Sequence, residues 1–276
     1  MKIAISQITT LPASTSDDLQ AFSQAGWQAA ELAISKVDKY LSGRTVEQLA
    51  ADLKAADLVP IAAIGLASPE ATLLLSKEEA YPAYELELER QLRLCQQLGI
   101  NNLGIGADPA AKAYPGWYDT ALVNVRKAGD LAAKYGVRLG LEFMSLNPPL
   151  GPFILENMEQ TLKLVEDAGH DHIGYNLDLF HFFRSGGTLA DIQNLPVEKL
   201  FHVHLCDLPH LRQPELDDSE RLLPGEGILP MNEIVSALEA KGYTGYLALE
   251  LLNQELWDKG PVYTANRGMQ AMSRYL

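Results

Sequence analysis

Four side chains of types that commonly bind metal ions stand inside otherwise apolar runs of this sequence. The runs and their residues are VRLGLEF with Glu142, HIGYNLD with Asp178, LFHVHLC with His204 and GYLALEL with Glu250. An ionised carboxylate is costly to bury alone, and a metal ion is the ordinary way to keep several carboxylates ionised and close together. Three carboxylates and one imidazole suit a hard divalent ion such as Mn²⁺, Mg²⁺, Co²⁺ or Zn²⁺. The sequence therefore predicts one divalent metal site at these four residues, if the fold brings them together.

Strand-length apolar runs alternate along the chain with longer amphipathic segments. The predicted strands cover residues 2–8, 27–34, 59–66, 101–107, 137–143, 172–178, 200–206 and 245–251. The predicted helices cover residues 16–25, 44–57, 82–98, 118–135, 157–168, 230–241 and 262–275. A further helix is expected after the sixth strand, where Gly186 and Gly187 could split it. Near-continuous apolar runs are typical of strands that protein covers on both faces.

This alternation predicts parallel strands joined by crossover helices. The segment SQITTLPAST after the first strand has no G-x-G-x-x-G, which disfavours a doubly wound dinucleotide-binding fold. Eight evenly spaced strands instead favour an α/β protein with a single (β/α)₈ TIM barrel domain that spans residues 1–276. Active sites of such barrels lie at the carboxyl ends of the strands, where the four side chains of ligand type stand.

The overall charge of the chain restricts its partners. Lys plus Arg number 22 and Asp plus Glu number 36, which gives a formal charge of −14. Charge of this sign repels nucleic acid and anionic membranes, so neither is an expected partner. Cys95 and Cys206 are expected to be reduced, and MKIAISQITT lacks the apolar run of a signal peptide. We therefore expect a cytoplasmic location, and the sequence leaves a homo-oligomer open.

Three stretches of the C-terminal half carry a family resemblance. They are NLDLFHFFRSGG with a D-x-x-H pattern, FHVHLCDLP with H-x-H-x-x-D, and RLLPGEGILPMNEIVSALEAKGYTGYLALEL with R-x-x-P-G-x-G and a strand ending in Glu. Together they resemble the xylose-isomerase-like TIM barrel superfamily, also called the sugar phosphate isomerase/epimerase family, in its ketose 3-epimerase and inosose isomerase branch. The motifs cover about residues 137–251, and GWQAAELAI resembles the second strand of the family.

The resemblance implies a role for individual residues. The metal ligands that it implies are Glu142, Asp178, His204 and Glu250. His181 and Arg221 match residues of the family that bind substrate beside the metal, and Glu142 and Glu250 match the pair that exchanges protons with substrate. The implied cofactor is one divalent metal ion, with Mn²⁺ favoured. The implied partner is a small polyol or sugar.

A vicinal hydroxy-ketone fits this chemistry, because a metal can stabilise the enediolate that forms when a carboxylate removes the α-proton. We expect an isomerase or epimerase of a small sugar, ketose or inosose. Loss of a β-hydroxyl from the same enediolate would make a dehydratase of the inosose or 3-dehydroshikimate type, for which His181 is a candidate acid. An endonuclease IV-like repair enzyme is a remote alternative, because the predicted second and third strands lack histidine and the net charge opposes DNA.

Several other polar residues are expected to support the site or the surface. His202 and Asn176 share strand parity with His204 and Asp178, which favours packing or supporting roles one layer deeper. Glu31 could reach substrate or pair with a buried base, and the sequence does not decide between them. Asp207 is expected to orient its surroundings. Arg184 and Arg212 are interpreted as ordinary surface residues.

Overall fold

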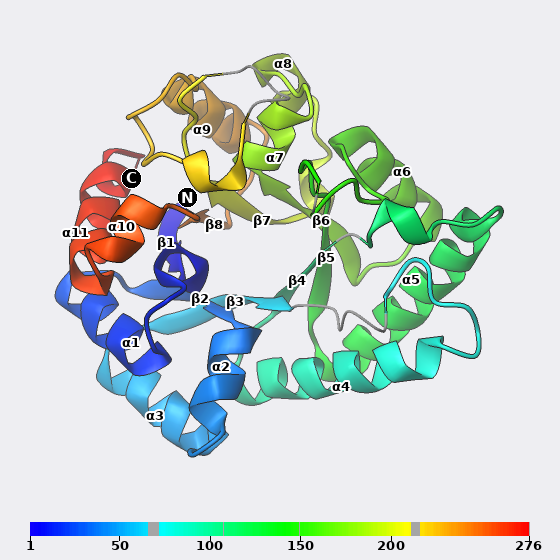
Figure 1. Cartoon of the computed structure of the whole chain (residues 1–276), viewed down its shortest axis with the longest axis horizontal. Coiled ribbons are helices and arrows are strands. Elements are labelled where there is room, and N and C mark those ends of the chain that lie inside the picture. Colours follow the sequence, from blue (N-terminus) through cyan, green and yellow to red (C-terminus); the bar gives the residue numbers. More distant parts are fainter. Residues whose placement is uncertain (66–71, 107, 149, 211–215, 276) are drawn as a thin grey trace.

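The computed structural model of this protein describes residues 1–65, 72–106, 108–148, 150–210 and 216–275. Arg212 and the last residues of the predicted strands 59–66 and 101–107 lie outside the described residues. Within the described part, the strands form a closed barrel in the order β1 to β8 and the helices surround it (Figure 1). The predicted (β/α)₈ barrel is therefore confirmed.

All neighbouring strands of the barrel run parallel, and β1 closes it by pairing with β8. The strands are β1 (Lys2–Ser6), β2 (Ala29–Ala33), β3 (Val59–Gly65), β4 (Asn102–Gly106), β5 (Arg138–Glu142), β6 (Ile173–Asp178), β7 (Leu200–Leu205) and β8 (Tyr246–Leu249). Each lies inside one of the predicted apolar runs. The carboxyl ends of parallel strands share one mouth of the barrel, so residues at those ends are brought together.

Helices alternate with the strands, and all of them except α10 have buried residues. They are α1 (Thr15–Gln24), α2 (Ile34–Leu41), α3 (Val46–Ala55), α4 (Tyr81–Leu98), α5 (Trp117–Tyr135), α6 (Met158–Ala168), α7 (Leu179–Arg184), α8 (Leu189–Ile192), α9 (Met231–Ala240), α10 (Gln254–Asp258) and α11 (Pro261–Met272). Gly99, Gly136 and Gly169 follow α4, α5 and α6 in the left-handed region, so these helices end at residues 98, 135 and 168, as the predicted ranges do. In the described chain, no helix is long and apolar enough to cross a membrane.

Two features differ from the predicted elements or refine them. The strand predicted for residues 27–34 stops at Ala33, because Ile34, Val37 and Tyr40 follow a helical spacing and bury one face of α2. The helix after β6 is indeed split into α7 and α8. Between them the φ of Gly186 is 96°, and a Cβ on Gly187 would lie 2.5 Å from the Phe182 ring, so both positions favour glycine.

Candidate metal centre

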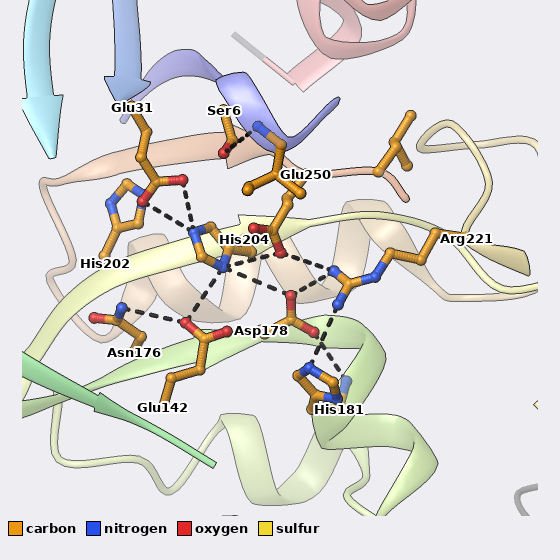
Figure 2. Close-up of polar contacts among 12 residues, drawn as sticks. Ser6, Glu31, Glu142, Asn176, Asp178, His181, His202, His204, Arg221 and Glu250 are labelled. Atoms are coloured by element: carbon orange, nitrogen blue, oxygen red, sulfur yellow. Dashed lines mark hydrogen bonds and ion pairs between the residues drawn. The ribbon is translucent and has the colours of Figure 1, made fainter. Parts of the chain in front are cut away.

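Four side chains converge at the carboxyl ends of β5 to β8 (Figure 2). The Nδ1 atom of His204 lies 3.5 Å from Glu142 Oε2, 3.6 Å from Asp178 Oδ2 and 3.4 Å from Glu250 Oε2. The four ligand atoms of this group all lie within 4.8 Å of one another. The fold therefore brings together all four residues of the predicted metal site.

Each of these side chains is placed by the strand that carries it. Glu142 and Asp178 are the last residues of β5 and β6, and His204 lies in β7 directly opposite Asp178 in the strand register. Glu250 follows β8, and its backbone N–H still donates to the carbonyl of Leu205, so the ladder holds it in place. Only Glu142 reaches appreciable solvent, since its side chain is 16% exposed and that of Glu250 is 6% exposed. A small molecule would therefore approach from the Glu142 side.

The imidazole of His204 has a defined orientation. Its Nε2 atom lies 3.1 Å from each oxygen of the Glu31 carboxylate. A carboxylate only accepts hydrogen bonds, so this nitrogen carries the hydrogen and Nδ1 is left to face the three other carboxylates. Among the described residues, no hydrogen-bond partner reaches this buried Nδ1 atom. A nitrogen lone pair and three carboxylate oxygens around one point fit a divalent cation.

The charges of the cluster also call for a cation at this point. Burial lowers the pKa of His204, but the carboxylates of Glu250, Glu31 and Glu142 outweigh burial and hold this pKa well above its ordinary value. Burial raises the pKa of Glu250 well above its usual range, although the charges of His204 and Arg221 oppose the change. In the absence of an ion, the raised pKa values favour protons on His204 and Glu250, which offset the negative charge of the carboxylates. A bound metal ion would replace these protons.

Metal affinity is accordingly expected to fall as the pH falls. His204 and Glu250 both hold their protons more tightly than free side chains do, so the ion must displace those protons to bind. Each proton displaced weakens the apparent affinity by up to about tenfold per pH unit of acidification. Chelator competition with Co²⁺ at several pH values between about 6 and 8 would measure this slope. An affinity that does not change over this range would contradict the displacement of protons.

Arg221 lies against two of the ligand carboxylates. Its Nη1 atom donates to Asp178 Oδ2 at 2.6 Å and to Glu250 Oε2 at 3.0 Å, and its Nε atom donates to Asp218 Oδ1 at 2.6 Å. Burial alone would raise the pKa of Asp178, but Arg221, and after it His181 and His204, hold that pKa well below its usual range. Asp218 was not singled out in the sequence, because nothing in its local pattern separates it from an ordinary loop acid.

His181 lies beside Arg221, and each of its ring nitrogens faces a donor. The backbone N–H of Ser145 donates to its Nδ1 atom at 3.3 Å, and Arg221 Nη2, which can only donate, lies 3.5 Å from its Nε2 atom. A neutral ring can accept from only one of these two donors. Arg184 donates to the hydroxyl of Ser145 at 2.8 Å and is only 7% exposed. The interpretation of Arg184 as a surface residue was therefore wrong, because the short helix α7 turns this side chain under the loop after β5.

A second polar layer lies below the four ligands. Asn176 donates to Glu142 Oε2 at 3.3 Å, which agrees with its expected supporting role. His202 Nε2 lies 3.1 Å from Glu31 Oε1, and Glu31 is fully buried. Burial raises the pKa of Glu31, but His204 and His202 outweigh it and hold this pKa well below its ordinary value. The open question about Glu31 is thus decided in favour of pairing with buried bases.

Asp207 holds the loop that carries Arg221. Its two carboxylate oxygens accept backbone N–H groups of Leu208, Gly225, Gly227 and Leu229 at 2.8–3.0 Å. A Cβ on Gly227 would lie 2.4 Å from Asp207 Oδ1, which explains the second glycine of the P-G-x-G motif. The orienting role predicted for Asp207 agrees with these contacts.

Replacing Asp207 by alanine is expected to destabilise the protein by about 2–5 kcal/mol, because several buried N–H donors lose their acceptor. Asp207→Asn keeps one acceptor oxygen and should cost less. Urea unfolding of the three proteins would measure the difference in the free energy of unfolding. An unchanged midpoint in Asp207→Ala would mean that the loop is held by other contacts.

A family model described as xylose isomerase-like TIM barrel matches residues 19–275. The chain belongs to this family. Within it, the chain is 27% identical to an inosose isomerase of Halalkalibacterium halodurans, over 93% of this chain and 90% of that protein. It is 29% identical to a 3-dehydroshikimate dehydratase of Pseudomonas putida, over 88% of this chain but only 36% of that longer protein.

Among solved structures, a crystal structure of the IolI protein with a bound zinc atom superposes with a TM-score of 0.88. The match covers 100% of this chain and 98% of the other at 21% identity, so it establishes the shared fold. The barrel of this family member is therefore supported by sequence and by structure alike.

Proposed function

We propose that this chain is a metal-dependent isomerase or epimerase of a small sugar, ketose or inosose, which acts through an enediolate. The observation that carries the proposal is the convergence of Glu142, Asp178 and Glu250 on the free nitrogen of His204. Two of these carboxylates, Glu142 and Glu250, are proposed to exchange protons with substrate as well as to hold the ion. The inosose isomerase of Halalkalibacterium halodurans, which matches over most of both chains, supports the same substrate class.

The proposed cofactor is one divalent ion held by Glu142, Asp178, His204 and Glu250. Mn²⁺ is favoured among Mn²⁺, Mg²⁺, Co²⁺ and Zn²⁺, because three of the four donors are carboxylates. When bound, such an ion supplies the positive charge that holds two neighbouring substrate oxygens and stabilises negative charge developing on them.

The protein side chains would carry the proton transfers. Glu142 and Glu250 approach His204 from opposite sides in Figure 2, so each can reach a different face of a substrate that lies between them. One carboxylate removes the proton from the carbon beside the carbonyl. Return of a proton by the other carboxylate to the same carbon inverts that centre, whereas return to the neighbouring carbon shifts the carbonyl.

His181 and Arg221 are proposed to bind the substrate oxygens. The ring nitrogen of His181 that carries hydrogen is a donor, which suits a carbonyl or hydroxyl oxygen. Arg221 would contribute a second donor from the same side, since its Nη2 atom lies 3.5 Å from His181. The buried position of both side chains would exclude water from that side of the reacting carbons.

A dehydratase of the inosose or 3-dehydroshikimate type is the second candidate. The 3-dehydroshikimate dehydratase of Pseudomonas putida matches over 88% of this chain. His181 also supports it, because a protonated imidazole beside a leaving hydroxyl can protonate that oxygen as its bond to carbon breaks. The two candidates share the first proton transfer and differ in the product.

One experiment tests the proposal and separates these two candidates. The purified chain, supplied with Mn²⁺ or Co²⁺, would be incubated in D₂O with a panel of ketoses, inososes and 3-dehydroshikimate. Metal-dependent incorporation of deuterium into a recovered sugar or its isomer would support the isomerase. An unsaturated product would support the dehydratase, and the absence of metal-dependent exchange with every compound would contradict both.

We also propose that residues 1–276 form one domain. Pairing of β1 with β8 joins the first and last strands of the chain, and α1 packs against α11, which supports this proposal. The charge of −14 supports a small-molecule partner rather than nucleic acid.

A further inference from the structure

Glu31 lies behind His204, on the side away from the three carboxylates of the candidate metal centre (Figure 2). Both of its oxygens lie 3.1 Å from His204 Nε2, and Oε1 also lies 3.1 Å from His202 Nε2. The Glu31 and His204 side chains are fully buried, and that of His202 is 3% exposed. Because Glu31 faces His204 and His202 and not the three carboxylates, a role other than contact with substrate fits it.

We propose that Glu31 is a positioning residue of the metal centre. It holds the hydrogen of His204 on Nε2, so that Nδ1 is the nitrogen presented to the ion, and His202 Nε2 lies 3.1 Å from Glu31 Oε1 on another side. This proposal rests on the metal site of the proposed function. It adds a residue on β2, across the barrel interior, to a centre whose ligands all stand at the ends of β5 to β8.

Three features of the geometry support a positioning role. First, β2 and β7 are not neighbours in the barrel, so the contact of Glu31 with His204 passes through the interior. Second, the pairing of β2 with β3 shifts register between Ala30 and Glu31, at the point where this side chain enters the barrel. Third, the ring of His202 lies 5.0 Å from the ring of His204 at an angle of 87°, so the two imidazoles meet Glu31 from different directions.

The contact also affects how strongly His204 can bind an ion. An imidazole whose N–H donates to a carboxylate is a stronger metal ligand than one that donates to a neutral group, and it cannot turn away from the ion without losing that bond. Partners of this kind typically change metal affinity by about 10- to 100-fold when they are replaced.

Glu31→Gln is the sharpest test, because glutamine keeps the shape and one acceptor oxygen but removes the charge. We expect the Kd for Co²⁺, measured by chelator competition, to rise by about 10- to 100-fold. At saturating Co²⁺, the absorption spectrum of the Glu31→Gln variant should match that of the wild type, because all four ligands are still present. Glu31→Asp keeps the charge but withdraws the carboxylate by about 1.5 Å, so it should also weaken binding if position matters.

Asp18→Asn is the matched control. Asp18 is also fully buried, but it pairs with Lys36 at 2.6 Å and accepts a hydrogen bond from Thr10, and it contacts none of the four proposed ligands. The Asp18→Asn variant is expected to have a lower unfolding midpoint than the wild type and a Kd for Co²⁺ within about twofold of the wild-type value. It tests only the loss of a buried carboxylate.

The outcomes separate this proposal from the metal site itself. A wild-type protein that binds no Co²⁺ would overturn both. If the wild type binds Co²⁺ tightly and both Glu31→Gln and Glu31→Asp bind it with the affinity of the wild type, the positioning role alone would be overturned. A loss of affinity in Asp18→Asn as large as in Glu31→Gln would also overturn it, because the effect would then come from general loosening of the fold.

Discussion

Replacing Asp178 by asparagine is expected to abolish tight metal binding while leaving the barrel folded. Its Oδ1 atom accepts the backbone N–H of His181 at 2.9 Å, and an amide oxygen can keep that bond at the start of α7. The amide nitrogen would then take the place of Oδ2, which faces His204 Nδ1 and accepts from Arg221 Nη1 at 2.6 Å, so the variant also loses a buried ion pair and is expected to be less stable. Structural zinc sites bind with about 10–16 kcal/mol spread over four ligands, so the loss of one predicts an affinity at least on the order of 100-fold weaker.

Elemental analysis and chelator competition would measure this change in metal content and affinity. Asp218→Asn is the matched control, because Asp218 contacts Arg221 at the same mouth but none of the four proposed ligands. It should weaken binding by less than about tenfold. Wild-type affinity in Asp178→Asn would remove Asp178 from the proposed ligand set.

Glu142→Gln and Glu250→Gln are each expected to slow exchange of substrate hydrogen by about 10²- to 10⁴-fold, the usual worth of a positioned acid or base. Glutamine keeps an oxygen for the ion but cannot accept a proton from carbon. Because both residues are also proposed ligands, the comparison must be made at saturating metal. Under that condition we expect kcat to fall much more than the affinity for substrate.

Deuterium incorporation at each carbon, followed by NMR, would assign a face of the substrate to each carboxylate. If the two act from opposite faces, each variant should lose exchange at a different centre or in a different epimer. Glu156→Gln is the control, since this exposed glutamate follows β5 without facing His204, and surface changes of this kind usually alter rates by less than about twofold. More than a tenth of normal exchange in either active-site variant would contradict a catalytic role for that residue.

Hydrophobic periodicity was sufficient to predict the barrel and the neighbourhood of the four proposed ligands. Parallel strands buried on both faces need near-continuous apolar runs, so a carboxylate at the end of such a run is conspicuous in the sequence itself. Because every strand of a parallel barrel ends at the same mouth, the positions of Glu142, Asp178 and Glu250 along the chain already implied that they meet. The ends of α4, α5 and α6, each followed by a glycine, could be predicted for a similar local reason.

Strand parity placed Asn176 and His202 one layer below the ligands, but the contacts of this second polar layer could not be obtained in this way. Which residues of β6 and β7 lie opposite one another depends on a register shift between Tyr175 and Asn176, which places Asn176 beside His202. Such shifts are set by closure of the whole barrel and leave no signal in the residues on either side. The same limit applies to Ser145, which contacts His181 Nδ1 through a backbone N–H that every residue except proline possesses.

The sequence by itself thus determined the eight strands, the mouth at which chemistry would occur and the types of side chain available there, because these depend on local patterns of burial. Only the tertiary structure decided how those side chains are charged and oriented. Glu31 illustrates the difference: its position in an apolar run left two roles open, and contact with His204 and His202 from another strand decided between them. Orientation and protonation depend on neighbours in space, and for a residue on β2 those neighbours lie more than half the chain away.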